Sequence, residues 1–232
     1  MNINKALKYI YISIYKTLFR LFYNFLTKIK KIDHNKVTIV LSRNNQLEGN
    51  LKYIHDELIE QIEKVKIHFV KAENKMNLNL FIELSRICDS RYLIIDDYYL
   101  LVYLLKPSSQ MKIIQLWHAA GALKKFGYST IGTKFGPTKE YLKLVPIHSN
   151  YTHVYVSSKS VVPFYAEAFN MSGKRIYPLG VPRTDLFFNE KHKEEAIKKI
   201  YSTNPAIKYQ QDKVKVLFAP TYRAEGNQKE SN

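Results

Sequence analysis

Apolar residues recur at steps of three and four through the first thirty residues, which is the spacing of one face of an α-helix. Lysines and arginines fall mostly between these positions, and residues 1–31 hold seven cations and no acidic residue. The pattern predicts a basic amphipathic helix. Its apolar stripe consists of Ile3, Leu7, Ile10, Ile14, Leu18, Leu21, Phe25 and Ile29.

Two interpretations of this helix are open, because an apolar stripe faces a lipid surface and a protein core equally well. Lys16 and Arg20 interrupt the most apolar part, which argues against a membrane span and against a cleavable signal peptide. The uncompensated cations favour a helix that lies on an anionic membrane surface over one that packs on the protein's own core.

From Val37 onward the pattern changes to short apolar runs separated by amphipathic segments. This alternation predicts an α/β fold, a Rossmann-like parallel sheet with flanking helices. In the first such helix Leu51, Ile54 and Leu58 share a face, and Asn50 is the expected N-cap. Further helices are expected at residues 78–88, 159–170 and 184–201. The predicted strands are 37–41, 67–70, 92–96, 113–117, 153–158 and 175–180.

A seventh strand is predicted at 214–223, where VKVLFAPTYR ends in a Pro-Thr turn and Arg223. The polar residues after it are typical of a frayed tail. We therefore expect three parts: a membrane-surface helix at 1–31, a Rossmann-like domain at 32–212, and a further strand with its tail at 213–232.

Composition narrows the function classes. The chain has 232 residues, a formal net charge of +16 and a single cysteine, Cys88. One cysteine excludes an internal disulfide framework and a cysteine-rich zinc site, and a reducing cytoplasm fits best. The charge predicts anionic partners. The common nucleotide, hydrolase and zinc motifs are missing and the histidines are scattered, so we expect neither a metal nor a cofactor.

Ligands of parallel sheets gather beyond the carboxyl ends of the strands. His118 follows the predicted strand 113–117, beside a segment with Lys124 and Lys125 between two glycines, and an imidazole there suits the handling of an anionic group. An acidic pair before a helix is often only a cap, so Asp96 and Asp97 are the weakest of the candidates. The other strand-end candidates are Ser42, Arg43, Ser157, Ser158 and Gly180.

Five linked motifs carry a resemblance to a known family. They are SRNNQLEGNLKYIHDEL at 42–58, QLWHAAGALKKFGYS at 115–129, HVYVSSKSVVPFYAEAF at 153–169, PLGVPRTD at 178–185 and FAPTYR at 218–223. In this order and spacing the chain resembles the CDP-glycerol glycerophosphotransferases of teichoic-acid synthesis, and it looks more like the primases than the polymerases. The resemblance covers about residues 37–223.

The resemblance implies the N-terminal half of a GT-B-type enzyme, bound peripherally at the cytoplasmic face of the cell membrane. It makes residues 32–212 the acceptor-side domain and residues 213–232 the first strand of a truncated second, nucleotide-binding domain with its tail. Such enzymes transfer glycerol phosphate from CDP-glycerol to a hydroxyl of an undecaprenyl-diphosphate-linked saccharide and release CMP, and related members use CDP-ribitol. It places the family's candidate general base on His118. Candidate substrate-binding residues are Arg183, Asp185, Arg223, Lys124, Ser42 and Asn50.

Plainer interpretations stay open beside these roles. Arg183 and Asp185 could pair with each other and brace their turn, and Lys124 and Lys125 could be solvated or contact lipid phosphates. The family's second domain would continue past Arg223, so the alternative function is an inactive or split fragment that binds membrane or lipid-linked acceptor. Other wall-synthesis enzymes are possible partners. A nucleic-acid partner is not expected, because much of the excess charge lies in residues 1–31 and no nucleic-acid module is recognisable.

Overall fold

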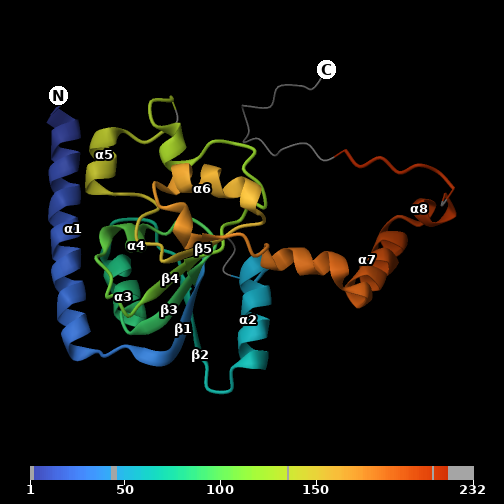
Figure 1. Ribbon diagram of the computed structural model, residues 1–232, viewed down its shortest axis with the longest axis horizontal. Helices are drawn as coiled ribbons and strands as arrows, with labels where there is room; N and C mark the ends of the chain where they lie inside the picture. Colours follow the sequence, from blue (N-terminus) through green and yellow to red (C-terminus); the bar gives the residue numbers. More distant parts are fainter. Residues whose placement is uncertain (1–2, 43–45, 135, 211, 219–232) are drawn as a thin grey trace. The chain divides into compact units, whose positions relative to one another are not determined.

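The computed structural model describes residues 3–42, 46–134, 136–210 and 212–218. The chain divides into two compact units, Met1–Asp185 and Leu186–Asn232. The division expected from the sequence, at residues 31 and 212, stays a prediction. The first unit is built on a six-stranded parallel sheet in the order β2-β1-β3-β4-β5-β6 (Figure 1). The strands are β1 (Asp33–Leu41), β2 (Lys66–Lys71), β3 (Ser90–Ile95), β4 (Lys112–Gln115), β5 (His153–Tyr155) and β6 (Ile176–Tyr177).

The predicted α/β sheet is confirmed, and its strand order locates the expected ligand edge. The chain runs from β1 outward to β2 and then returns to the other side of β1 to form β3. Connections on the two sides of this point leave the sheet in opposite directions, and ligands of open parallel sheets bind at that reversal, beyond the carboxyl ends of the strands. Ser42 follows β1 there, and Asp96 and Asp97 follow β3.

Helices cover both faces of the sheet, and alternate strand residues face them. Leu93 and Ile95 face a core that five helices share, whereas Ile94 faces a smaller core against α2 (Gly49–Gln61). The shorter helices α4 and α5 are additional to those predicted. The five helices are α1 (Ile3–Ile29), α3 (Leu78–Ile87), α4 (Leu100–Leu104), α5 (Lys139–Leu144) and α6 (Val162–Phe169).

The predicted N-terminal helix is confirmed as α1, and it has two apolar faces. One face packs against α3, α4 and α5 through Ile12, Tyr15, Phe19, Tyr23 and Leu26, which are all buried. The stripe recognised in the sequence points the other way, and its eight side chains are 54–76% exposed. The helix therefore packs on its own core without using the predicted stripe.

Two cations of α1 serve the fold, which removes part of the charge argument for a lipid surface. Lys16 Nζ donates to the carbonyl of Leu144 at the end of α5. Arg20 Nε donates to Leu104 O at the end of α4, at 2.9 Å. Cations suit these positions because the carbonyl groups of a last helical turn have no partner within the helix. Lys5, Lys8 and Lys28 remain exposed. Within the described residues, no helix combines the length and apolarity needed to cross a membrane.

The local predictions for Asn50 and for the end of β4 are wrong. Asn50 does not cap α2: the N-cap is Glu48, and Asn50 lies buried in the first turn. The strand predicted at 113–117 ends at Gln115, because the chain turns there. Of the strand predicted at 214–223, residues 219–223 lie outside the described residues. Residues 214–218 pair with no other described strand, and Val214 and Phe218 are exposed, so this strand stays a prediction.

The second unit contains α7 (Glu190–Thr203), which confirms most of the helix predicted at 184–201, and the short α8 (Pro205–Tyr209). Asn189 caps α7, since its side chain accepts a hydrogen bond from His192 N at 2.9 Å. The residues before α7, Pro182–Phe188, form a 3-10 helix instead of the predicted α-helix.

Candidate functional site

His118 lies in a turn that begins directly after β4 and is fixed by the side chain of Gln115. Gln115 is fully buried; its Oε1 accepts a hydrogen bond from Trp117 N at 2.7 Å, and its Nε2 donates to Asp97 O at 3.1 Å. Trp117 has a φ of 54°, in the left-handed region that bulky residues rarely occupy. Such a conformation costs about 1–3 kcal/mol and persists only when its surroundings impose it.

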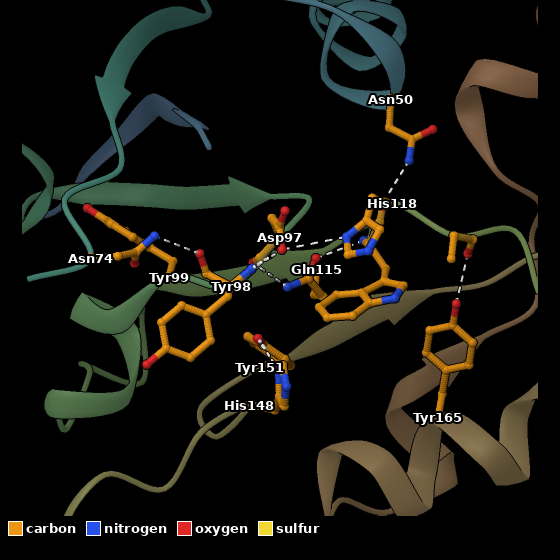
Figure 2. Close-up of polar contacts among 12 residues, drawn as sticks. Asn50, Asn74, Asp97, Tyr98, Tyr99, Gln115, His118, His148, Tyr151 and Tyr165 are labelled. Atoms are coloured by element: carbon orange, nitrogen blue, oxygen red, sulfur yellow. Dashed lines mark hydrogen bonds and ion pairs between the residues drawn. The ribbon is translucent and has the colours of Figure 1, made fainter. Parts of the chain in front are cut away.

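Donors from three other parts of the chain hold the carbonyl groups around His118, and Figure 2 draws the contacts of Asn50 and Tyr165. Asn50 Nδ2, from α2, donates to Trp117 O at 2.7 Å. Tyr165 Oη, from α6, donates to Ala119 O at 2.8 Å, and Ser157 Oγ donates to Ala120 O. The main chain on both sides of the histidine is therefore fixed by elements from both faces of the sheet.

Asp97 faces the imidazole from the neighbouring strand end. Asp97 Oδ1 lies 3.6 Å from His118 Nδ1, and the two side chains are 22% and 30% exposed (Figure 2). Asp97 Oδ1 also accepts a hydrogen bond from Tyr98 N at 2.7 Å. A carboxylate on the Nδ1 side of a histidine favours the tautomer with the proton on Nδ1 and the lone pair on Nε2.

Two aromatic rings and a neutral histidine pack beneath His118. The Trp117 ring stacks on the imidazole, with 4.4 Å between ring centroids, and Phe126 stacks on Trp117 at 4.9 Å. His148 packs against Trp117, and burial lowers the pKa of His148 to about 4, so this second histidine is neutral at pH 7. Its Nδ1 lies 3.1 Å from Tyr151 Oη.

Asn50 also brings the motif containing Arg183 next to the turn of His118. Its Oδ1 accepts a hydrogen bond from Arg183 N at 3.1 Å while its Nδ2 holds Trp117 O. The side chains of Arg183 and Asp185 are exposed, and the structure shows no ion pair between these two described residues. The Arg183–Asp185 pairing that the sequence left open is therefore not made; the turn is held through its backbone.

The remaining candidates are placed less closely. Ser42 directly follows β1, and its hydroxyl has no hydrogen-bond partner among the residues that are described. Lys124 and Lys125 are exposed on the loop after His118. Arg43 and Arg223 lie outside the described residues.

Two residues of this site were undervalued or misread in the sequence. Asp97 was, with Asp96, the weakest strand-end candidate. Asn50 was expected to cap a helix and was also a candidate substrate-binding residue, whereas its side chain binds the backbone at Trp117 and Arg183. Strand order brings Asp97 to His118, because β3 and β4 are neighbours in the sheet. Asn50 is 67 residues from Trp117 and 133 from Arg183 in sequence. Its polarity within an apolar helical face was the available signal.

A cavity of about 560 Å³ lies on the α2 side of the sheet and reaches Asp185. Its walls are mostly aliphatic and aromatic, with Glu57 and Asp185 among them, and its lining includes neither lysine nor arginine nor His118. Such a lining does not suit a phosphate-bearing substrate. In the described part of the chain, no three His, Cys, Asp or Glu side chains gather as metal ligands would.

Known proteins resemble this chain in both sequence and structure. It is 37% identical over 226 residues to the teichoic acid ribitol-phosphate primase of Bacillus spizizenii, covering 94% of this chain and 57% of the relative. It is 33% identical over 162 residues to the teichoic acid glycerol-phosphate primase of Bacillus subtilis, covering 69% and 37%. The chain thus spans little more than half the length of the first relative and less than half the length of the second.

The solved structure of the wall teichoic acid polymerase TagF has the same fold, with a TM-score of 0.61 at 15% identity, covering 86% of this chain and 52% of TagF. The family described as CDP-glycerol:poly(glycerophosphate) glycerophosphotransferase matches residues 21–232. The match takes in the turn of His118, the motif of Arg183 and the strand end of Asp97. The chain belongs to the CDP-glycerol:poly(glycerophosphate) glycerophosphotransferase family.

Proposed function

We propose that this chain forms the acceptor-side half of a GT-B-type transferase of wall teichoic-acid synthesis. It would transfer glycerol phosphate from CDP-glycerol to a hydroxyl of an undecaprenyl-diphosphate-linked saccharide, releasing CMP, in a primase-like reaction. The observation that supports this most is the position of His118, held in a fixed turn beside Asp97 in a chain of this family.

The residue types fit the chemistry. The acceptor hydroxyl attacks the phosphorus of the glycerol phosphate and must lose its proton, which His118 Nε2 accepts. The bond between that phosphorus and the bridging oxygen breaks, and CMP leaves with the bonding electrons. Negative charge on the phosphoryl oxygens and on CMP is stabilised by cations. Arg183 and Lys124 are exposed candidates for this role, and Arg223 is a third.

The donor polyol is the finer part of the proposal. CDP-glycerol follows from the family description, whereas the Bacillus spizizenii relative is named a ribitol-phosphate primase. Both CDP-glycerol and CDP-ribitol therefore enter the test as donors. The product distinguishes a primase from a polymerase, since a primase adds a single polyol phosphate to its acceptor.

The test supplies each donor and the lipid-linked saccharide to the purified chain, and measures CMP. Because the chain spans about half of its relatives, it is assayed alone and joined to the part of the Bacillus spizizenii primase that it does not match. His118→Ala should abolish turnover, while His68→Ala, at an exposed histidine of the edge strand β2, should not. No CMP in either format, or full activity of His118→Ala, would refute the proposal. Binding of the lipid-linked acceptor without turnover would favour an acceptor-binding module.

The proposal includes peripheral association with the cytoplasmic face of the membrane through α1. Other wall-synthesis enzymes would be partners of the chain there. The support for this association is the exposed apolar stripe of α1, which remains outward although another face of the helix packs on the core. Lys5, Lys8 and Lys28 are exposed on the same helix, which carries no acidic residue. An apolar stripe flanked by cations suits an anionic bilayer.

A further inference from the structure

We propose that Asp97 is a positioning residue that acts through His118 by fixing its tautomer and stabilising its protonated form. The inference rests on the proposed role of His118 as the general base. It assigns a function to a carboxylate that no sequence motif pointed to.

The geometry sets which imidazole nitrogen faces the carboxylate. Asp97 Oδ1 lies 3.6 Å from His118 Nδ1, on the side of the ring toward the end of β3. This distance suits an ion pair and is slightly longer than a hydrogen bond. Contacts of catalytic groups are often long without substrate and shorten when it binds. A carboxylate accepts but does not donate, so it favours the tautomer with the proton on Nδ1 and the lone pair on Nε2.

The carboxylate is itself held in place. Its Oδ1 accepts a hydrogen bond from Tyr98 N at 2.7 Å. The backbone carbonyl of Asp97 accepts one from Gln115 Nε2 at 3.1 Å, and Oε1 of the same glutamine holds Trp117 N. One buried side chain thus fixes the strand end that carries the acid and the turn that carries the base. The pair is positioned before any substrate arrives, which is what preorganised catalysis requires.

The proton transfer in the proposed reaction assigns Asp97 a specific role. Nε2 takes the proton of the acceptor hydroxyl as the new oxygen–phosphorus bond forms, and the ring becomes an imidazolium with a proton on each nitrogen. The adjacent carboxylate stabilises that positive charge and stays ionised throughout. The imidazolium then loses the Nε2 proton to solvent, which restores the starting tautomer.

His148, Lys124 and Lys125 do not supply this stabilisation. His148, on the far side of Trp117, is neutral at pH 7 because burial lowers its pKa to about 4. Lys124 and Lys125 are exposed on the loop that follows, and their charge opposes protonation of the ring. Asp97, which follows the partly buried Asp96, is the carboxylate whose Oδ1 lies 3.6 Å from the imidazole Nδ1.

The first experiment needs no turnover, so it separates this inference from the proposed function. The imidazole nitrogens of the purified, 15N-histidine-labelled chain are observed by NMR above neutral pH. Wild type should show His118 with its proton on Nδ1, and Asp97→Ala should shift it toward the mixture of tautomers of an unconstrained ring. The matched control is Asp56→Ala, which removes an exposed carboxylate 2.9 Å from His55 Nδ1 on α2. An unchanged His118 signal in Asp97→Ala, with the fold verified by circular dichroism, overturns the inference.

The second experiment is kinetic and uses whichever format releases CMP. Asp97→Asn should lower kcat on the order of 10²-fold, with little change in the KM for the acceptor. The acidic limb of its pH–rate profile should move to lower pH, because the imidazolium has lost its counter-charge. Asp97→Glu should recover part of the rate, and Asp56→Ala should match wild type. A change confined to the KM for the acceptor, or an acidic limb that does not move, contradicts a positioning role. Absence of CMP release in wild type refutes the proposed function. In that case the NMR result alone decides the inference.

Discussion

The outward face of α1 allows a quantitative test of membrane association. Ile10, Ile14 and Leu18 lie in the middle of the exposed stripe, and each side chain is 54–56% exposed. Full burial of such a side chain is worth about 1.5–3 kcal/mol, so burying the exposed half against lipid contributes about 1 kcal/mol for each. Replacing all three by glutamine, a good helix former, should cost about 3 kcal/mol of membrane binding, or about 100-fold in the partition coefficient.

The assay is co-sedimentation with vesicles that contain phosphatidylglycerol, compared with vesicles of phosphatidylcholine alone. The matched control replaces Ser13, Thr17 and Asn24, which are exposed polar residues of the same helix, by glutamine. Neither variant should change the free energy of unfolding by more than about 0.5 kcal/mol per site, because these side chains are exposed. Equal binding of the stripe variant and wild type to the anionic vesicles, or equal loss in the control, would refute a membrane role for the stripe.

Two further predictions concern buried polar groups of the first unit. Glu83 is buried beside Tyr99, whose hydroxyl donates to it at 2.8 Å, and burial raises the pKa of Glu83 from 4.5 to about 7. The folded state therefore binds the extra proton, and the free energy of unfolding should fall by up to about 3 kcal/mol as pH rises from about 4.5 to 7. Glu83→Gln should remove most of this fall, as measured by urea unfolding at pH 5 and pH 8. An unaltered pH dependence would contradict the assignment. Asn50→Ala leaves Trp117 O and Arg183 N without their partner and should cost about 2–4 kcal/mol of stability, measured by thermal unfolding. The control Asn24→Ala, on the exposed surface of α1, should cost less than about 1 kcal/mol. Equal losses would contradict a stabilising role for the two hydrogen bonds of Asn50.

Strands of the sheet could be predicted from the sequence because parallel strands are buried on both faces and appear as short continuous apolar runs. The helix α4 could not be found in the same way. All five of its residues are buried, so it has no polar face and no helical period to recognise. For α1, helical periodicity identified one apolar stripe, but the face that packs on the core is largely aromatic and became visible only with its partner Phe81, which contacts Tyr15 and Phe19.

Within the candidate site, His118 could be found from the sequence because it follows an apolar run and lies in a recognisable motif. Asp97 and Asn50 were among the candidates, but the way in which they support the histidine could not be found from the sequence. The pairing of β3 with β4 brings Asp97 to the imidazole, and no local pattern encodes that pairing. The turn itself depends on Trp117 in the left-handed region of backbone conformation, whereas the sequence pattern predicts this residue as the end of the strand.

The mass of the lipid-linked saccharide after incubation with each donor tests the central claim most directly, since it reports the transferred group itself. With the chain joined to the region of the Bacillus spizizenii primase that it does not match, the mass should increase by one glycerol phosphate or one ribitol phosphate. The His118→Ala variant should leave the acceptor unchanged, and the His68→Ala control should modify it as wild type does. An unmodified acceptor in the wild-type reaction, or a His118→Ala variant that modifies it at the wild-type rate, would contradict a transferase in which His118 is the base.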